Sequence, residues 1–595
     1  METRYNKRIK GVKTKMVRVL LGAAFFTLHS SLFTSCNDFL TIYPTDRIVA
    51  EDFWKTKSDV DQMVDGTYQS MLAYDIQERA IIWGAFRSDE LVKYSAYSDN
   101  TLDNIEGVNL LPSQRYNSWG AFYKVINNCN IVLSHAPGVM EEDPEFTQGD
   151  YEVVRAQMLA LRSLCYFYLV RAFRDVPYSD KAIEDDSKVE MLPQLPPAEV
   201  LQHCLDDLAA AEPYVMRSGV YGDWRDKGYF TRDAVHALMA DIYLWRAAMT
   251  HNKGDYQQVI DLVDKVVKAK DKYYVENYPL SVTGEEDDSL HLYDADEAFT
   301  MIFNNDYMNS FESILEWQYN GTNNSNQALE NYYYQSGGEK DYKSTSMVMA
   351  STLFGSASND GSKVYLSTND YRFWNNVYGA NSEEAEQLSI RKMVDESGRT
   401  FSPITSSSAT KSNSRPFKEF RQNWIVYRIT DLLLMKAEAL VETASDSTDV
   451  VTLQKAFDLV KAVNDRSMSK NAKDKLAFTD YGSMASMEQL VLDERERELC
   501  FEGKRWFDLL RYSYRHMTGV NINQRLADTD TWPAIYTAMP KLIARKYTSG
   551  GGDAVTYKMK SEPYLYWPIR EGELKVNSLL KQNPVYHQEE TISKN

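Results

Sequence analysis

The stretch that decides the fold is RAQMLALRSLCYFYLVRAF, which runs from residue 155 to residue 173. Its apolar side chains recur at steps of three and four residues, the spacing of one face of an α-helix. These side chains are Met158, Leu161, Cys165, Tyr168, Leu169 and Ala172. We therefore predict an amphipathic helix here. It should end before Pro177, because a proline biases the preceding residue toward an extended conformation.

Two further stretches predict pairs of helices joined by a short polar turn. The first pair runs from 231 to 269, with Thr231 as its N-cap, and the second runs from 427 to 466. Small residues such as Ala240 and Ala437 would let the two helices of a pair approach closely. Each unit has roughly the length of a tetratricopeptide-like hairpin, which buries a continuous core only by stacking on its neighbours. The sequence therefore predicts a mainly α-helical fold of stacked hairpins.

The region 271–426 interrupts this helical pattern. It is rich in Asn, Ser, Gly and Tyr, and it holds short apolar alternations such as ESILEWQY at 312–319, which predict strands. Long irregular regions are usually functional or disordered, and the many aromatic residues argue against disorder. We predict a signal segment at 1–35, a helical region at 36–270, a loop-rich and strand-containing ligand-binding insertion at 271–426, and a second helical region at 427–595.

Composition narrows the classes of function. The chain has 595 residues, 43% of them hydrophobic, so it should form a large folded core. With 66 Lys and Arg against 85 Asp and Glu, its net charge is −19, which argues against nucleic-acid binding. Its 40 Tyr and 11 Trp are amphipathic rings that serve cores and ligand platforms alike.

The N-terminus predicts export and lipid attachment. Several Lys and Arg residues precede the apolar run VLLGAAFF at 19–26, which has the length of a signal-peptide core and is too short to span a bilayer. LFTSC follows, with small residues directly before Cys36. This arrangement indicates a lipoprotein signal that is cleaved after residue 35, with lipid attached to Cys36. Ordinary secretion remains the alternative, because Phe33 stands where Leu is usual.

The remaining chemistry-bearing residues indicate structure more than catalysis. We predict that the other cysteines are buried free thiols, since their spacing is not that of a metal site. They are Cys129, Cys165, Cys204 and Cys500. A disulfide between two of them is the alternative. We predict no cofactor and no metal. The acidic stretches at 285–297 and 527–532 leave calcium as an alternative, but neither has the spacing of a known calcium loop.

The stretch 487–512 predicts a helix with ion pairs three and four residues apart, among them Glu494 with Arg497 and Glu502 with Arg505. An acid/base pair for catalysis is the alternative. We favour a salt-bridged helix that packs Phe501, Trp506 and Leu509 inward and is interrupted near Gly503, so we predict no catalytic residue.

Five stretches together resemble the SusD/RagB family of outer-membrane nutrient-binding lipoproteins. They are CNDFL at 36–40, RSLCYFYLVRAFRDVPY at 162–178, YRITDLLLMKAEAL at 427–440, ERERELCFEGKRWFDLLRY at 494–512 and YLYWPIREGELKVNSLLKQNPVY at 564–586. They occur in the family's order and span nearly the whole chain after residue 35.

The resemblance implies a SusD-like helical superhelix with a loop-rich ligand-binding half, anchored through Cys36 at the cell surface of the outer membrane. It also implies that the protein captures oligosaccharides and delivers them to a SusC-like TonB-dependent transporter. Two alternatives remain: a RagB-like protein that captures peptides, and a secreted glycoside hydrolase.

A sugar-binding site needs exposed aromatic planes flanked by amide, carboxylate or guanidinium groups. Three stretches offer such groups, and their candidate ligand-binding residues are Trp83, Arg87 and Tyr94, then Tyr332, Tyr333 and Tyr334, and finally Arg372 and Trp374. The consecutive tyrosines should turn at least one ring outward in an extended conformation. For Arg372 a structural pairing with Asp370 competes with binding, and for Trp317 we favour packing in the core.

Overall fold

The computed structural model describes residues 53–586 of the chain, apart from several gaps. The gaps are residues 96, 186–188, 278–289, 304–309, 322–323, 337–342, 345–346, 351–363, 366, 378–386, 395–420, 471 and 548–550. The range Thr56–Asn595 is one compact unit, and it holds every element described below. The predicted signal peptide at 1–35 and the predicted lipid attachment at Cys36 lie outside the described residues.

Helices dominate the described part of the chain. The α-helices are α3 (Lys57–Ser70), α4 (Tyr74–Ile81), α5 (Asn100–Glu106), α6 (Gly120–Glu142), α7 (Gln148–Phe173), α8 (Pro197–Ala211), α9 (Arg225–Gly228), α10 (Arg232–Thr250), α11 (Lys253–Asn277), α12 (Ala295–Phe303), α13 (Gln327–Tyr332), α15 (Tyr371–Asn375), α17 (Ile429–Thr443), α18 (Val450–Ser467), α19 (Met484–Leu499), α20 (Arg505–Arg515), α21 (Ala538–Ala544), α22 (Gly551–Lys558) and α23 (Glu571–Val576). A π-helix, η1 (Ile82–Phe86), follows α4, and the short 3-10 helices are η2 (Arg115–Asn117), η6 (Phe478–Asp480), η7 (Leu526–Asp528), η8 (Glu562–Leu565) and η9 (Pro584–Tyr586).

The strands are short. They are β1 (Val92–Lys93), β2 (Val176–Pro177), β3 (Gln194–Leu195), β4 (Ser313–Trp317), β5 (Gln335–Ser336), β6 (Lys343–Ser344), β7 (Met347–Ala350), β8 (Gln387–Ser389) and β9 (Trp424–Arg428). All pairings among them are antiparallel: β1 with β7, β7 with β8, β2 with β3, β4 with β9 and β5 with β6.

Helix α7 contains the stretch predicted from periodicity and begins earlier than predicted. Its start is fixed by a capping box, in which the Thr147 side chain accepts a hydrogen bond from the Asp150 amide and the Asp150 carboxylate accepts one from the Thr147 amide. Within the described residues, α7 is the helix that is long and apolar enough to cross a membrane. Most residues of its apolar stretch are buried inside the protein, as in the core helix of a folded unit.

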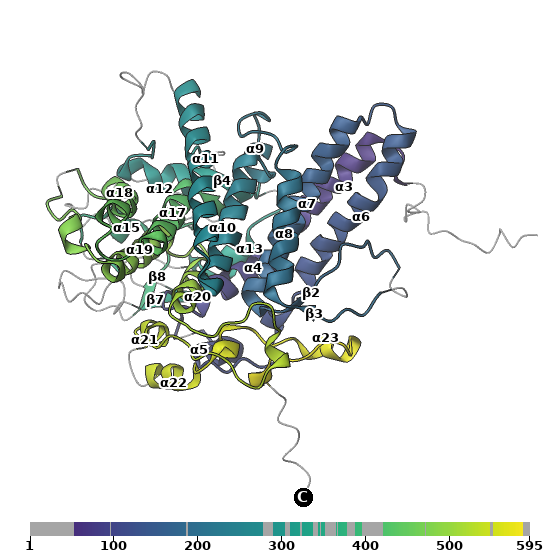
Figure 1. Cartoon of the computed structure of the whole chain (residues 1–595). Helices are drawn as coiled ribbons and strands as arrows, with labels where there is room; N and C mark the ends of the chain where they lie inside the picture. The colour runs from purple at the N-terminus through teal and green to yellow at the C-terminus, as the bar shows by residue number, and fades with distance from the viewer. Residues whose placement is uncertain are drawn as a thin grey trace, which may run out of the picture. The chain divides into compact units, whose positions relative to one another are not determined.

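The long helices are stacked side by side (Figure 1). Helix α7 packs between α6 and α8, α8 contacts α10, α10 pairs with α11, α11 contacts α17, and α17 pairs with α18. The pairs α10–α11 and α17–α18 are the two predicted hairpins. The prediction of a mainly α-helical fold built from stacked hairpins is therefore confirmed.

An antiparallel pair of strands, β4 and β9, brings residues 313–317 of the predicted insertion against residues 424–428 at its C-terminal end. Ser313 lies opposite Arg428, and Trp317 lies opposite Trp424. The strand predicted within 312–319 is confirmed, and Trp317 is buried as predicted. The predicted boundaries at 270 and 426 fall inside α11 and β9, so neither coincides with the end of an element.

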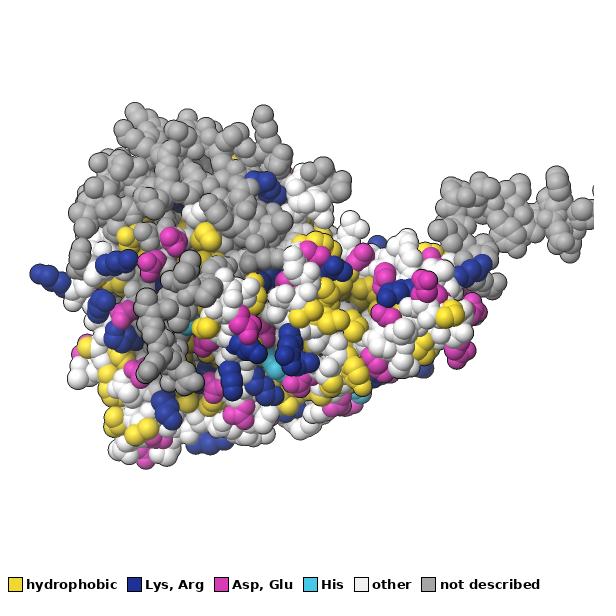
Figure 2. Space-filling view, turned by 90° about the horizontal axis from the view of Figure 1, so that it is seen from above, with side chains coloured by type: hydrophobic (Ala, Val, Ile, Leu, Met, Phe, Trp, Pro, Cys, Tyr) yellow, Lys and Arg dark blue, Asp and Glu magenta, His cyan; other side chains and the backbone are white. Residues whose placement is uncertain are grey.

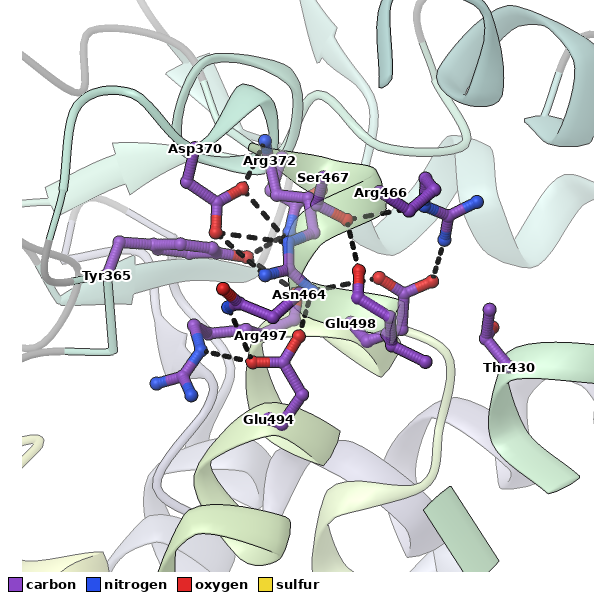
Figure 3. Close-up of polar contacts among 12 residues, drawn as sticks. Tyr365, Asp370, Arg372, Thr430, Asn464, Arg466, Ser467, Glu494, Arg497 and Glu498 are labelled. Atoms are coloured by element: carbon purple, nitrogen blue, oxygen red, sulfur yellow. Dashed lines mark hydrogen bonds and ion pairs between the residues drawn. The ribbon is translucent and has the colours of Figure 1, made fainter. Parts of the chain in front are cut away.

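Helix α19 carries carboxylates that are buried and paired (Figure 3). Glu494 and Glu498 are 0% and 3% exposed. Arg372 Nη1 lies 2.8 Å from Glu494 Oε1 and 2.9 Å from Glu498 Oε2, and its guanidinium also binds Asp370. The predicted pair of Glu494 with Arg497 is confirmed at 2.9 Å. These contacts support the prediction of a salt-bridged helix.

Two further guanidinium groups bind the Glu498 carboxylate. Arg428 Nη1 lies 2.6 Å from its Oε1, and Arg466 from α18 also binds it. Arg428 additionally binds Glu502 through Nε and Nη2, at 2.9 and 2.7 Å. One carboxylate therefore connects the insertion, through Arg372, with β9 and α18.

The ion pair predicted between Glu502 and Arg505 is wrong. Arg505 forms two hydrogen bonds of 2.8 Å with Asp89 and an ion pair of 2.7 Å with Glu496, because the turn after α19 separates it from Glu502. Asp89 follows α4 and η1, so this buried pair joins two segments that lie 416 residues apart in the sequence.

The turn after α19 contacts η1 backbone to backbone. A Cβ atom on Gly84 would lie 1.9 Å from the Gly503 carbonyl oxygen. Gly503 has a φ of +70°, in the left-handed region that favours glycine, and a Cβ there would lie 2.7 Å from the Ala80 carbonyl oxygen. No side chain fits at either position, and the predicted interruption near Gly503 is confirmed.

The C-terminal residues pack against the end of α7. Arg174 Nε donates to Glu562 Oε1 at 2.8 Å, and the Trp567 amide donates to the Ala172 carbonyl oxygen at 2.9 Å. Two stretches that carried the family resemblance are thus in direct contact. The four cysteines predicted to be buried thiols are free and buried. Burial raises the pKa of the Cys129 thiol to about 12.

We expect the variant Glu498→Gln to lose about 3–5 kcal/mol of unfolding free energy, because it leaves three buried guanidinium groups without their shared carboxylate. Burial alone would raise the pKa of Glu498, but Arg466, Arg428 and Arg372 hold it well below the ordinary value of 4.5. Its stabilisation is therefore complete above that value and is lost as the pH falls below it. Chemical denaturation between pH 3 and 8 measures both effects.

The matched control is Glu190→Gln, which removes an exposed pair with Lys181 whose side chains are 62% and 74% exposed. We expect a change of at most about 1 kcal/mol for this variant. Equal losses in the two variants would contradict a special role for Glu498.

Candidate functional site

Trp83 lies in the core. Its side chain is 0% exposed, and its ring stacks on Phe122 at 5.4 Å between centroids and meets Phe173 edge to face. The indole Nε1 donates to the Tyr116 carbonyl oxygen at 2.9 Å. Because both the ring and its N–H group are occupied, Trp83 has no face for a sugar. The prediction that Trp83 binds ligand is wrong.

Arg87 is also structural. It is 7% exposed, its Nη1 and Nη2 donate to the carbonyl oxygens of Leu565 and Tyr564 at 2.9 and 2.7 Å, and its guanidinium lies 4.1 Å from the centre of the Trp506 ring. Burial lowers the pKa of Arg87 to about 10. The prediction that Arg87 binds ligand is wrong, because its donors hold the C-terminal segment.

The tyrosine run does not form an extended segment. Tyr332 ends α13, is 2% exposed, and donates to Glu78 from its hydroxyl. Tyr333 is 0% exposed, and its hydroxyl donates to the Phe501 carbonyl oxygen at 3.1 Å. The helix end turns both rings inward, so the prediction of an outward platform is wrong for these two residues. Tyr334 is half-buried, as is Tyr94, and a binding role for these two stays a prediction.

Arg372 and Trp374 also belong to the interior. Arg372 is 8% exposed and lies within the ion-pair cluster of Figure 3, bound to Asp370 through Nη2 at 2.7 Å. Trp374 is 6% exposed and donates through Nε1 to the Thr368 carbonyl oxygen at 2.9 Å. Both predictions of ligand binding are therefore wrong. For Arg372, the structural pairing with Asp370 takes the place of ligand binding.

A pocket of about 410 Å³ lies between α3, α7, α9 and β4. This volume is in the range of sites that hold small ligands. Its buried apolar lining residues are Met71, Leu161, Leu164, Phe230, Leu315 and Trp317. Its polar lining residues are Asp65, Gln69, Glu316, Gln318, Asn320 and Asn324. Figure 2 views the molecule from the side on which α9 lies in Figure 1, and hydrophobic side chains gather there among charged ones.

Trp224 gives this pocket an accessible aromatic surface. Its side chain is 43% exposed and meets the Tyr229 ring edge to face at 5.4 Å. Asp226 holds the preceding turn, because its carboxylate accepts hydrogen bonds of 2.9–3.0 Å from the amides of Gly219, Tyr221 and Gly222. The loop that presents Trp224 is therefore well ordered by its own contacts.

Tyr229 fixes the loop to the helices beneath it. Its ring stacks on Tyr68 of α3 with centroids 4.1 Å apart, and its hydroxyl donates to Asp65 Oδ1. The Tyr68 hydroxyl donates to Gln157 of α7, and Gln157 Nε2 donates to the Phe230 carbonyl oxygen at 2.8 Å. These contacts hold Trp224 in place relative to α3 and α7.

Side-chain amides at the end of β4 provide hydrogen-bonding groups. The backbone N–H of Asn320 donates to the side-chain oxygen Oδ1 of Asn324 at 2.9 Å. Gly321, which lies between them, has a φ of +74°. Asn320 is exposed, as is Gln69 on α3. Burial raises the pKa of Tyr68 and of Tyr229, so both phenols stay neutral near pH 7. The pocket therefore combines an exposed indole with amide, hydroxyl and carboxylate groups.

Trp224 is not among the residues predicted to bind ligand, although its sequence context carries a signal. GVYGDWRDKGYF at 219–230 alternates glycines with aromatic residues between two helices, which indicates an ordered loop with presented rings. Within the denser aromatic stretches that predicted binding, Trp83, Tyr332, Tyr333 and Trp374 lie in the core instead.

The alternative of calcium binding gains no support from the acidic stretches. Residues 285–289 of the first stretch lie outside the described residues. In the other stretch, Asp528 binds Arg525 and Lys581. Across the described ranges, no three His, Cys, Asp or Glu side chains are grouped so that they could hold a metal ion.

Comparison with known proteins agrees with this architecture. A family model described as "SusD family" matches residues 298–586, and one described as "Starch-binding associating with outer membrane" matches residues 38–244. SusD-like protein P2 of Formosa agariphila is 23% identical over 500 residues, covering 80% of this chain and 87% of the relative. SusD-like protein P38 of the same organism is 23% identical over 526 residues, covering 84% and 92%.

Solved structures share the fold. A SusD superfamily protein from Bacteroides vulgatus superposes with a TM-score of 0.62 at 17% identity, covering 89% of this chain and 99% of that one. Another structure from B. vulgatus, described as a candidate sugar binding protein, gives 0.59 at 20% identity with the same coverage. The two family models and the curated relatives together show that the chain belongs to the SusD family.

Proposed function

We propose that the protein captures oligosaccharides at the cell surface and delivers them for uptake. The observation that carries this proposal is the half-exposed indole of Trp224 at a pocket of about 410 Å³ with exposed amides. A pyranose ring has an apolar C–H face that stacks on an indole, and its hydroxyls exchange hydrogen bonds with amides and carboxylates. The sugar-binding description of a structural neighbour and the starch-binding description of a matched family model support this ligand class.

The expected affinity is modest. Each good ring contact contributes roughly 0.5–1.5 kcal/mol beyond burial, so a few contacts give a Kd in about the micromolar to millimolar range. Such affinity suits capture followed by release. We therefore propose binding without turnover, with the chain acting as a carrier protein rather than an enzyme.

We further propose that the mature protein is attached to the outer membrane through lipid on Cys36 and works with a SusC-like TonB-dependent transporter. The family description that names outer-membrane association supports the location. Membership of the SusD family supports the partner, because such a transporter is the family norm.

We expect Trp224→Ala to weaken oligosaccharide binding by about tenfold, because a tenfold change corresponds to about 1.4 kcal/mol, the size of one good ring contact plus its burial. Trp224→Phe should retain part of the affinity. Calorimetry with a panel of neutral hexasaccharides measures both, and circular dichroism checks the fold.

The control is Tyr557→Ala on α22, which removes an aromatic ring that is 71% exposed and does not line the pocket. It should bind as the wild type does. Unchanged binding in Trp224→Ala would contradict the proposed site. Binding of oligopeptides without any glycan would support the peptide-binding alternative, and sugar release on prolonged incubation would support a hydrolase.

Gly228 has no side chain, so the Trp224 ring lies against the backbone at this position. A Cβ on Gly228 would lie 2.7 Å from Cε3 of that ring, so Gly228→Ala must displace the indole. We expect a loss of affinity of about three- to tenfold with little change in thermal stability, because an exposed ring can move aside.

The double variant Trp224→Ala/Gly228→Ala should bind no more weakly than Trp224→Ala alone, since both changes act through one ring. Gly138→Ala in α6, where a Cβ meets nothing within 4 Å, is the matched control and should leave affinity unchanged. Additive losses in the double variant would disprove the coupling.

A further inference from the structure

Two charged side chains line the pocket within the described part of the chain, and both are acidic. They are Asp65, which is exposed on α3, and Glu316, which is buried in β4. Asp61 lies one helical turn before Asp65 and is also exposed. Burial raises the pKa of Asp61, Lys57 opposes this shift, and Asp65 adds to it, which shows that the two carboxylates lie within electrostatic reach of each other.

The cations near the pocket are engaged elsewhere. Arg225 binds Asp223 through Nε at 3.1 Å and Nη2 at 2.7 Å, and its guanidinium lies 5.0 Å from the centre of the Tyr221 ring. Lys227 is 5% exposed and does not line the pocket. It lies beside the buried Lys270, whose ammonium is also near Asp233 and Glu316.

Glu316 therefore lies within electrostatic reach of the buried Lys270, whereas Asp65 forms no ion pair within the described residues. Within the described residues, the hydrogen bond that Asp65 receives comes from the neutral Tyr229 hydroxyl. A hydroxyl donor leaves the negative charge of the carboxylate in place. The mouth of the pocket thus carries the negative charge of Asp65, with Asp61, whose charge Lys57 and Arg225 partly offset, one helical turn away.

We propose that this pocket selects uncharged or cationic sugar units and excludes anionic ones such as uronates and sulfated sugars. The inference deepens the proposed function and rests on it. A like charge about 5 Å from a carboxylate in water lowers affinity roughly fourfold, and a second carboxylate raises the penalty to about tenfold. Salt screens exposed charges, so this penalty should shrink as ionic strength rises.

The test is calorimetry of the full-length protein with hexasaccharides that differ in charge. Neutral probes are the hexamers of cellulose, starch, xylan and mannan; anionic probes are oligogalacturonate, oligoglucuronate and a sulfated galactan hexamer; the cationic probe is a chitosan hexamer. We expect at least one neutral or cationic probe to bind and every anionic probe to bind at least about tenfold more weakly. Raising NaCl from 50 to 500 mM should narrow this gap.

Asp65→Lys should narrow the gap between neutral and anionic probes by about tenfold or more, because it reverses the charge at the pocket mouth. The matched control is Asp261→Lys, the same change at an exposed position of α11 outside the pocket lining, and it should leave the gap unchanged. A reduced gap in both variants would show a general effect of net charge and would overturn the inference.

The remaining outcomes separate this inference from the proposed function. Tight binding of an anionic hexasaccharide that is lost in Trp224→Ala would overturn the charge selection and leave the proposed function standing. Binding of none of the probes would overturn the proposed function, and with it the inference.

Discussion

The buried carboxylate of Glu498 is the constraint on which the rest of the structure depends. Charges in a low-dielectric interior must be paired closely, because an unpaired one costs several kcal/mol. The cluster around it contains Glu312, Asp370, Glu494, Glu498 and Glu502 as acids and Arg372, Lys392, Arg428, Arg466 and Arg497 as bases. Acids and bases balance in number. Since they come from the insertion, β9, α18 and α19, the pairing fixes these segments relative to one another.

The pocket is linked to this ion-pair cluster indirectly, through β4 and β9. Its apolar base comes from the helices α3 and α7, and one wall comes from β4, which is held by its pairing with β9. Arg428 ends β9 and binds Glu498, so the strand that forms this wall is tied to the ion cluster. The loop with Trp224 adds an accessible ring to a rigid base. Rigid walls with one presented ring suit a site that must bind weakly and release.

The sequence predicts the helical elements well because their signals are local. The spacing of apolar residues in α7 and the two hairpins shows which face of each helix is buried. This face can be identified from residues within a few helical turns of one another. Ion pairs separate into two kinds. The pair of Glu494 with Arg497 lies within one helix and could be predicted, whereas the pair of Arg505 with Asp89 depends on the tertiary fold.

The binding residues could not be predicted in the same way, because exposure is a property of the whole fold. The rings of Trp83 and Tyr333 are both covered by segments distant in sequence, by Phe122 and Phe173 around Trp83 and by Phe501 beside Tyr333. Arg87 binds carbonyl oxygens of Leu565 and Tyr564, which no local pattern reveals. Trp224 is different, since glycines around an aromatic residue mark a turn that presents it.

The close approach of Gly84 to Gly503 sets the order in which the native state can be completed. The backbone of the N-terminal π-helix meets Gly503 only after the chain has been synthesised past the turn that follows α19. Contacts this distant in sequence raise the contact order, which slows folding and prolongs the life of partly folded intermediates. The face of η1 that meets Gly503 therefore stays uncovered until the residues after α19 have been synthesised.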